Sequence, residues 1–305
     1  MADLLAGASW TAVRTPPGAA AGPDGLAGLE RLPALVPGTA AGVLRAAGLP
    51  PGDDLDEQDW WWQTTLPAAE DAVLRVGGLA TVAEVWLDEA CIHRGDNMFV
   101  STDLPLGTVA AGIRLSVVCR ALGPLLRARH PRPSWRTRLV PTQNLRFFRT
   151  ALFGRLTADD ATPAPVGPWR GISLLTGPVR RFSVLPSVSG DRATVEVTVE
   201  LAAQAGSVRV LVGDVPVALN GDGIRFRGSA DVSSLARWWP YGYGDPALHQ
   251  AVLEVGGSPV ASTLVGLREV RRSRLDQDGF ALSCNGVPVF ARGAVWSPVD
   301  PVGLQ

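Results

Sequence analysis

The chain has 305 residues, of which 46% are hydrophobic and 19% charged, and its 28 basic and 29 acidic residues give a net charge of −1. This composition excludes a disordered chain, and no apolar run approaches the ~20 residues that a membrane helix needs. The near-neutral charge gives no general attraction to nucleic acid or to an anionic membrane, so we predict a soluble protein with neither as a partner.

The first 50 residues are rich in alanine, glycine and proline. Met1 to Trp10 lacks the basic patch and apolar stretch of a signal peptide and has the acidic Asp3 instead, so we expect a cytoplasmic protein. Within this region only Thr39 to Ala47 is predicted to form a short helix, capped by Thr39 and stopped by Gly48.

From Trp60 to Arg120 the apolar residues alternate with polar ones, which predicts short half-buried strands. The predicted strands are Val73–Val76, Val82–Leu87 and Ile113–Cys119. The run Trp60-Trp61-Trp62 could stack on sugar rings, but on a strand Trp61 faces away from its two neighbours. At least one face of this strand is therefore expected to be core, and we favour core packing for the run.

Residues 123–168 are crowded with proline, arginine and aromatic residues and lack alternation, which predicts long loops on a β scaffold. Their basic and aromatic residues allow packing and salt bridges against another domain, contact with a sugar, or a nucleic-acid patch. We favour the first. All the basic residues of the chain are arginines, so a cluster of arginines is weaker evidence for a binding function here than it would be in other proteins. The residues concerned are Arg132, Trp135, Arg136, Arg138, Arg146, Phe147, Phe148 and Arg149.

A second all-β region follows the predicted strand Gly171–Leu175 and the Gly177-Pro178 boundary. Alternation in Ala193–Leu201 and Val208–Val212, with turns about every ten residues, predicts an immunoglobulin-like sandwich. Further on, Phe280–Cys284 and Val287–Arg292 flank Asn285-Gly286. This dipeptide favours a type I′ turn, so a β-hairpin is expected there.

The three cysteines, Cys91, Cys119 and Cys284, are odd in number, widely spaced and embedded in apolar segments. This spacing suggests neither a disulfide framework nor a metal site. We expect the thiols to be reduced and buried, and we expect no metal and no cofactor.

Motifs that are weak one by one occur in a specific order along the chain. They are Leu35-Val36-Pro37-Gly38-Thr39, Trp60-Trp61-Trp62, Ala83–Asp88, Asn97-Met98-Phe99, Arg132-Pro133, Gly167–Ile172, Trp238–Leu248, Asn285–Phe290 and Arg292–Asp300. Taken in this order they resemble the front part of glycoside hydrolase family 2, in its β-mannosidase branch. Trp238–Leu248 is similar to the signature that ends the family's immunoglobulin-like domain, and the last two motifs are similar to the entry into its catalytic barrel.

The resemblance implies an all-β fold in three parts. Residues 1–178 would form a jelly-roll, galactose-binding-like sandwich and residues 179–270 an immunoglobulin-like β-sandwich. Residues 271–305 would be the truncated start of a (β/α)8 TIM barrel. The implied partners are a β-linked saccharide such as a β-mannoside, and the missing barrel supplied in cis or in trans.

Retaining glycoside hydrolysis needs two carboxylates about 5–5.5 Å apart, which the family takes from later barrel strands. No glutamate follows Glu269, so we identify no catalytic residue and expect no hydrolysis from this chain alone. Trp296 and Asp300, which follow the first barrel strand, and Arg149 are predicted to contact substrate. The sugar-contacting Trp-Asp pair of β-mannosidases has no counterpart in 147–156, so mannose specificity is not implied. The alternative function is a standalone carbohydrate-binding or scaffold module.

Overall fold

The computed structural model describes residues 2–50, 55–131, 134–157, 162–274, 280–294, 296 and 298–304. The chain divides into two compact units, which we call the first unit (Ala2–Thr176 with Trp296–Gln305) and the second unit (Gly177–Val295). Strands dominate the described residues and pair in antiparallel sheets, which confirms the predicted all-β class. In that part of the chain no helix is long and apolar enough to cross a membrane.

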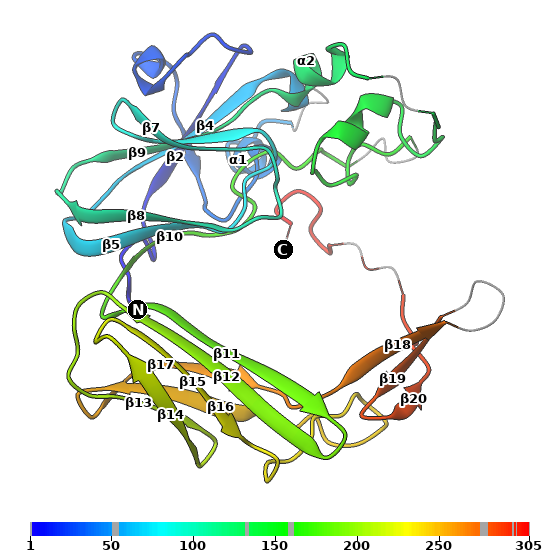
Figure 1. Cartoon of the computed structure of the whole chain (residues 1–305). Coiled ribbons are helices and arrows are strands. Elements are labelled where there is room, and N and C mark those ends of the chain that lie inside the picture. The colour runs from blue at the N-terminus through cyan, green and yellow to red at the C-terminus, as the bar shows by residue number, and fades with distance from the viewer. Residues whose placement is uncertain are drawn as a thin grey trace. The chain divides into compact units, whose positions relative to one another are not determined.

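The first unit is a sandwich of two antiparallel sheets, seen edge-on in Figure 1. One sheet has the order β3-β2-β4-β9-β6-β7, built from Leu32–Ala34, Trp10–Thr15, Asp59–Thr65, Arg114–Cys119, Ala83–Leu87 and Ala90–Gly95. The other has the order β1-β10-β5-β8, built from Ala2–Asp3, Ile172–Thr176, Ala69–Val76 and Thr102–Val109. The three strands predicted from alternation correspond to β5, β6 and β9, and the predicted strand Gly171–Leu175 corresponds to β10.

The tryptophan run on β4 is buried on both faces of its sheet. Trp60 and Trp62 belong to the core between the sheets, whereas Trp61 packs on the outer face with Leu26 of the 3₁₀ helix η1 (Pro23–Leu26). All three side chains are at most 1% exposed. Core packing is therefore confirmed, and stacking of these rings on a sugar is excluded.

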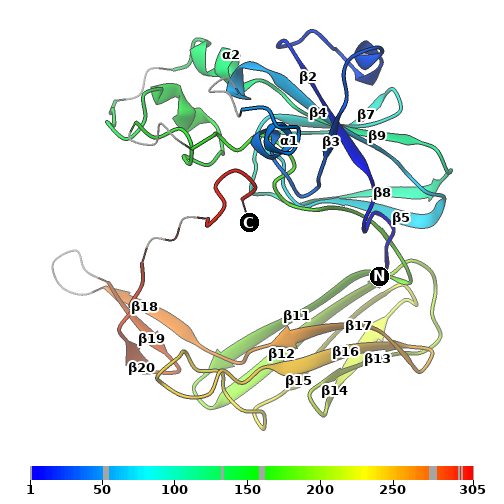
Figure 2. The ribbon, with the colours of Figure 1, turned by 180° about the vertical axis from the view of Figure 1, so that it is seen from behind.

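Helix α1 (Ala40–Ala46) follows β3 and lies beside it (Figure 2). Its apolar residues Ala40, Ala41, Val43 and Leu44 belong to the core between the two sheets. The Thr39 hydroxyl accepts a 3.0 Å hydrogen bond from the Gly42 amide, which satisfies one of the free donors at the helix start. Gly48 then adopts φ +72°, a left-handed conformation that favours glycine after a helix. The predicted cap and stop of this helix are both confirmed.

The remaining helices of the first unit lie in or near the long loops. Helix α2 (Leu122–Arg127) follows β9, and the short 3₁₀ helices η2 (Leu55–Glu57) and η3 (Gln143–Phe147) lie near it. None of these was predicted. Each is too short to display a clear apolar period in the sequence.

The second unit contains a seven-stranded antiparallel sheet with the order β11-β12-β15-β14-β13-β16-β17. These strands are Val179–Ser189, Arg192–Leu201, Arg225–Asp231, Val215–Gly221, Val208–Val212, His249–Val255 and Ser258–Val265. The first and last strands of this order also contact each other, so the sheet closes around one apolar core. The alternating valines of β12 point into that core, as the sequence predicted.

The second unit ends in a separate three-stranded sheet of β18 (Val270–Arg274), β19 (Phe280–Cys284) and β20 (Val287–Val289). Asn285 and Gly286 between β19 and β20 have φ +49° and +82°, as a type I′ turn requires. The predicted hairpin is confirmed, although its second strand ends at Val289 and not at Arg292.

The cysteines are free, as predicted, but their burial differs. Cys119 and Cys284 are buried. Cys91 is only half-buried, because it lies on β7, the edge strand of its sheet, where one side has no neighbouring strand to cover it. The prediction of burial is therefore wrong for Cys91.

Candidate functional site

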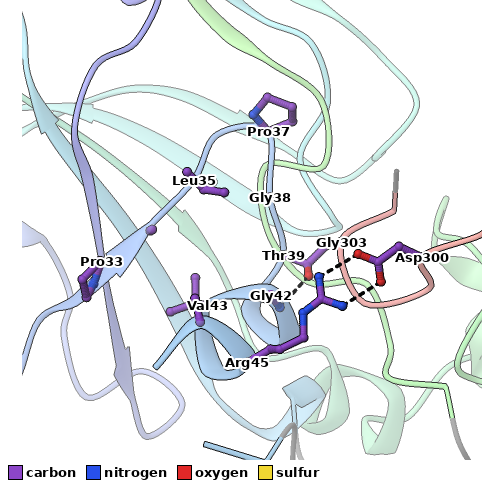
Figure 3. A pocket seen from close by; sticks show the side chains of 12 residues that line it. Pro33, Leu35, Pro37, Gly38, Thr39, Gly42, Val43, Arg45, Asp300 and Gly303 are labelled. Atoms are coloured by element: carbon purple, nitrogen blue, oxygen red, sulfur yellow. Dashed lines mark hydrogen bonds and ion pairs between the residues drawn. The ribbon is translucent and has the colours of Figure 1, made fainter. Parts of the chain in front are cut away.

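A pocket of about 370 Å³ opens on the first unit beside helix α1 (Figure 3). Its walls come from the segment 33–39 that leads into the helix, from α1 itself and from the turn 300–303. Most of the lining is apolar, and Leu35 is 73% exposed there. The lining residues are Pro33, Ala34, Leu35, Pro37, Gly38, Thr39, Gly42, Val43, Arg45, Ala46, Asp300 and Gly303.

Arg45 and Asp300 form a bidentate ion pair at one wall of this pocket. Arg45 Nη1 donates to Asp300 Oδ1 at 2.9 Å and Arg45 Nη2 donates to Oδ2 at 2.6 Å, as Figure 3 shows. The pair lowers the pKa of the Asp300 carboxyl well below its usual range, and the backbone amides of Gly303 and Val302 act in the same direction. Asp300 is therefore ionised at neutral pH and both of its oxygens are occupied.

Thr39 connects the same turn to the start of the helix. Its hydroxyl donates to the Val302 carbonyl while accepting from the Gly42 amide. Within the turn, the Leu304 amide donates to the Asp300 carbonyl at 2.8 Å. The turn is thus fixed to α1 at two points, the helix cap and the Arg45 guanidinium.

The pocket has the chemistry of a binding wall and not of a hydrolytic centre. Asp300 is the one carboxylate among its described lining residues, and a retaining hydrolase needs two. No group of three histidine, cysteine, aspartate or glutamate residues in the described ranges could hold a metal ion. The pocket can present an apolar surface and the Arg45–Asp300 ion pair to a ligand.

Arg149 lies elsewhere on the first unit, where it forms a β-bridge with Asn97. The Met98 amide donates to the Arg149 carbonyl at 3.0 Å, and the Trp169 indole donates to the Met98 carbonyl at 2.8 Å. A hollow of about 290 Å³ adjoins Asn97, and its polar lining residues are Thr81, His93, Asp96, Asn97 and Thr102. The motif Asn97-Met98-Phe99 therefore connects the segments around Arg149 and Trp169 next to a polar hollow.

The three predicted substrate contacts do not share one pocket. Asp300 lines the pocket at α1, Trp296 is 81% exposed, and Arg149 is exposed beside Asn97. That each of them touches a substrate stays a prediction. The sequence reasoning missed Arg45, since its only signal was a basic residue in the last turn of a predicted helix.

Comparison with known proteins gives a family match for residues 28–170, to the model described as glycosyl hydrolase 2 galactose-binding domain-like. The chain is 28% identical over 280 residues to β-mannosidase B of Aspergillus fumigatus, a match that covers 81% of this chain and 33% of the relative. β-Mannosidase B of Thermothelomyces thermophilus is 27% identical over 279 residues, with 80% and 32% covered. The chain thus spans about a third of the length of the curated relatives it matches.

Two solved structures have a similar fold across nearly the whole chain. The β-D-mannosidase from Dictyoglomus thermophilum superposes with a TM-score of 0.67 at 19% identity and covers 96% of this chain and 40% of its own. The exo-chitosanase from Amycolatopsis orientalis gives a TM-score of 0.63 at 17% identity, with 97% and 37% covered.

Proposed function

We propose that this chain is the non-catalytic N-terminal part of a β-mannosidase-like hydrolase and lines part of its sugar site. The proposal is supported by the galactose-binding-like domain of glycosyl hydrolase family 2 that the chain carries and by its homology to the N-terminal third of β-mannosidase B. In this proposal a catalytic barrel, in cis or in trans, supplies the two carboxylates. The present chain supplies part of the wall around a β-linked saccharide.

The observation that carries the proposal is the docking of the turn 300–304 on helix α1. The resemblance assigns this turn to the first loop of the barrel, and barrel active sites lie at the ends of the strands from which such loops emerge. Arg45 and Thr39 hold the turn from the sandwich side. By binding this loop, Arg45 of the sandwich would fix one wall of the substrate site without taking part in the chemistry.

Within this proposal the predicted contacts have separate roles. Trp296 offers an exposed indole that can stack on a sugar ring. Arg149 is exposed, and its backbone pairs with that of Asn97, which lines the polar hollow. Both carboxylate oxygens of Asp300 accept hydrogen bonds from Arg45. We therefore assign to Asp300 the role of positioning the loop in preference to contacting the sugar.

The proposal is tested by completing the barrel. The chain is fused to the segment of Thermothelomyces thermophilus β-mannosidase B that follows the matched third, and release of nitrophenol from nitrophenyl β-mannoside is measured. We expect activity from the fusion and a clear loss in the Arg45→Ala fusion. A folded fusion without activity on any neutral β-glycoside reporter would contradict the proposal.

A standalone sugar-binding module is the second candidate, and the family match of residues 28–170 favours it. The two candidates differ in a calorimetric titration of the 305-residue chain with β-1,4-mannobiose. Saturable binding without any need for a barrel supports the module, and its absence favours the partial active site. For either candidate we propose a cytoplasmic location, since the three free thiols suit a reducing compartment.

A further inference from the structure

The chain has an uneven distribution of charge in the long loops of the first unit. Between Asp103 and Asp159 there is no acidic residue, but there are ten arginines, namely Arg114, Arg120, Arg127, Arg129, Arg132, Arg136, Arg138, Arg146, Arg149 and Arg155. A stretch of this composition is unexpected in a chain whose net charge is −1. Its positive charge is therefore a local property.

Acidic residues from outside this stretch neutralise four of the arginines. The ion pairs are Arg114 with Asp24, Arg120 with Asp59 and Glu84, Arg127 with Glu57, and Arg155 with Asp56. Among the described residues no carboxylate forms an ion pair with Arg136, Arg138 or Arg146. Arg136 and Arg138 are also exposed, so their charges face solvent.

Next to these charges an exposed tryptophan is held in one orientation. Trp135 is 59% exposed, and the Arg146 guanidinium carbon lies 4.1 Å from the centre of its ring. Arg146 also donates to the Trp135 carbonyl at 2.8 Å and to the carbonyl and side-chain oxygen of Gln143, each at 2.8 Å. Gln143 in turn binds both backbone groups of Thr137. We call Trp135, Gln143 and Arg146 the Trp135 platform.

The platform leaves one face of the indole for a ligand. Arg146 covers the opposite face, and its hydrogen bonds fix the ring before any ligand arrives, which lowers the entropic cost of binding. An indole face packs well on the C–H face of a pyranose ring. Arg136 and Arg138 follow Trp135 by one and three residues in the same loop and are exposed. A guanidinium group matches a carboxylate in a two-bond geometry.

From this arrangement we propose that the Trp135 platform, with Arg136 and Arg138, binds a saccharide that carries carboxylate groups. That the ligand is a saccharide rests on the proposed function. The new part of the inference is that this saccharide is negatively charged. A neutral sugar would use the indole and leave two guanidinium groups without partners.

A nucleic acid fits the same loops less well. Binding of a single strand uses successive aromatic platforms for successive bases. Here His130 already stacks on one face of Phe147 at 4.6 Å and meets the edge of Phe148 at 5.8 Å. Trp135, at 59%, is the most exposed of the described aromatic rings of this loop, ahead of Phe147 at 41%, which suits a single sugar unit.

The test compares two ligands of the same skeleton by calorimetry with the 305-residue chain. The probes are β-1,4-linked tetramannuronate, which has a carboxylate on each sugar, and the neutral β-1,4-linked mannotetraose. We expect saturable binding of tetramannuronate, weakened by added salt because the arginines are exposed. Mannotetraose is expected to bind at least about tenfold more weakly, the size of one lost charge-assisted hydrogen bond.

Variants locate the site. Trp135→Ala and the double variant Arg136→Gln with Arg138→Gln are each expected to weaken tetramannuronate binding about tenfold. The double variant changes only exposed side chains, so it remains informative if Trp135→Ala disturbs the loop. The control is Arg14→Gln, which removes an exposed charge from β2 of the same unit and should leave binding unchanged.

Three outcomes would overturn the inference. They are equal affinity for both tetrasaccharides, an equal loss in the Arg14→Gln control, or tighter binding of a thymidine decanucleotide through Trp135. None of them touches the hydrolysis test of the proposed function, because that test uses neutral reporters. Conversely, an inactive barrel fusion that still binds tetramannuronate would contradict the proposed function but not the binding of a charged saccharide at the Trp135 platform.

Discussion

Arg120 and Asp59 form a buried ion pair at the end of the six-stranded sheet. Arg120 Nη1 lies 2.8 Å from Asp59 Oδ2, and Asp59 is 1% exposed. The carboxylate also accepts hydrogen bonds from the backbone amides of Ala121 at 2.7 Å and Gly18 at 3.1 Å. Arg120 extends over the Trp61 ring and reaches Glu84 at 2.7 Å, so this network covers the outer face of the tryptophan strand.

Asp59→Ala is expected to lower the free energy of unfolding by about 3–5 kcal/mol, because it leaves a largely buried guanidinium without its main partner. Urea unfolding followed by tryptophan fluorescence measures the change. The matched control is Asp103→Ala, which breaks the exposed ion pair with Arg75 and should cost at most about 1 kcal/mol. Similar losses in the two variants would show that the Arg120 network is not energetically special.

The ion pair of Arg45 and Asp300 is expected to hold the turn 300–304 on helix α1. Arg45→Ala should therefore raise the hydrogen-exchange rate of the Leu304 amide, which donates to the Asp300 carbonyl. Arg14→Ala, which removes an exposed arginine from β2, should leave that rate unchanged. Unchanged exchange in Arg45→Ala would mean that the Thr39 contact alone fixes the turn.

The same pair predicts the pH dependence of this docking. The folded-state pKa of Asp300 lies below its value of about 3.9 in an unfolded chain, so the carboxylate contributes stability above that pH. The contribution is lost as the pH falls further. Exchange in 300–304 should stay constant from pH 7 to pH 5 after correction for the intrinsic rate and should rise only below about pH 4. In Asp300→Asn that rise should be absent.

Thiol reactivity provides an independent check on the first sheet. Burial raises the pKa of the Cys119 thiol to about 12, so almost no thiolate forms at pH 8. In the native protein we expect a thiol reagent to modify the half-buried Cys91 first and to leave Cys119 unmodified until urea unfolds the chain. Rapid native labelling of Cys119 would contradict the packing of β9.

The three-stranded sheet of β18, β19 and β20 is expected to open more readily than the sheets of the two sandwiches. Val270, Val287 and Phe290 of this region are exposed, and little apolar surface is buried there. Amide exchange in β19 should be faster than in β12, whose valines form the core of the second unit. Equal protection of the two strands would contradict this expectation.

Much of the fold follows from local sequence patterns. Alternation predicted β5, β6, β9, β12 and β13, and the dipeptide Asn285-Gly286 predicted its turn, because a strand face and a turn conformation are set by neighbouring residues. The cap of α1 was predictable for the same reason. The residues that cover Trp61 were not predictable, since Ala20 and Leu26 belong to no alternating pattern.

The site was less predictable than the fold. Asp300 could be selected from its motif, but its partner Arg45 is 255 residues away and no local pattern connects them. The Trp135 platform was suspected as a cluster of basic and aromatic residues. The sequence could not reveal which arginines are neutralised, because every neutralising carboxylate comes from outside the stretch.

The activity of the 305-residue protein alone most directly tests the proposal that this chain lines a sugar site without itself performing hydrolysis. Purified protein is incubated with nitrophenyl β-mannoside, β-galactoside and β-glucuronide, and released nitrophenol is followed by absorbance. We expect no release above the uncatalysed rate for any of the three. Sustained turnover that copurifies with the chain would contradict it, because it would require a pair of catalytic carboxylates within these 305 residues.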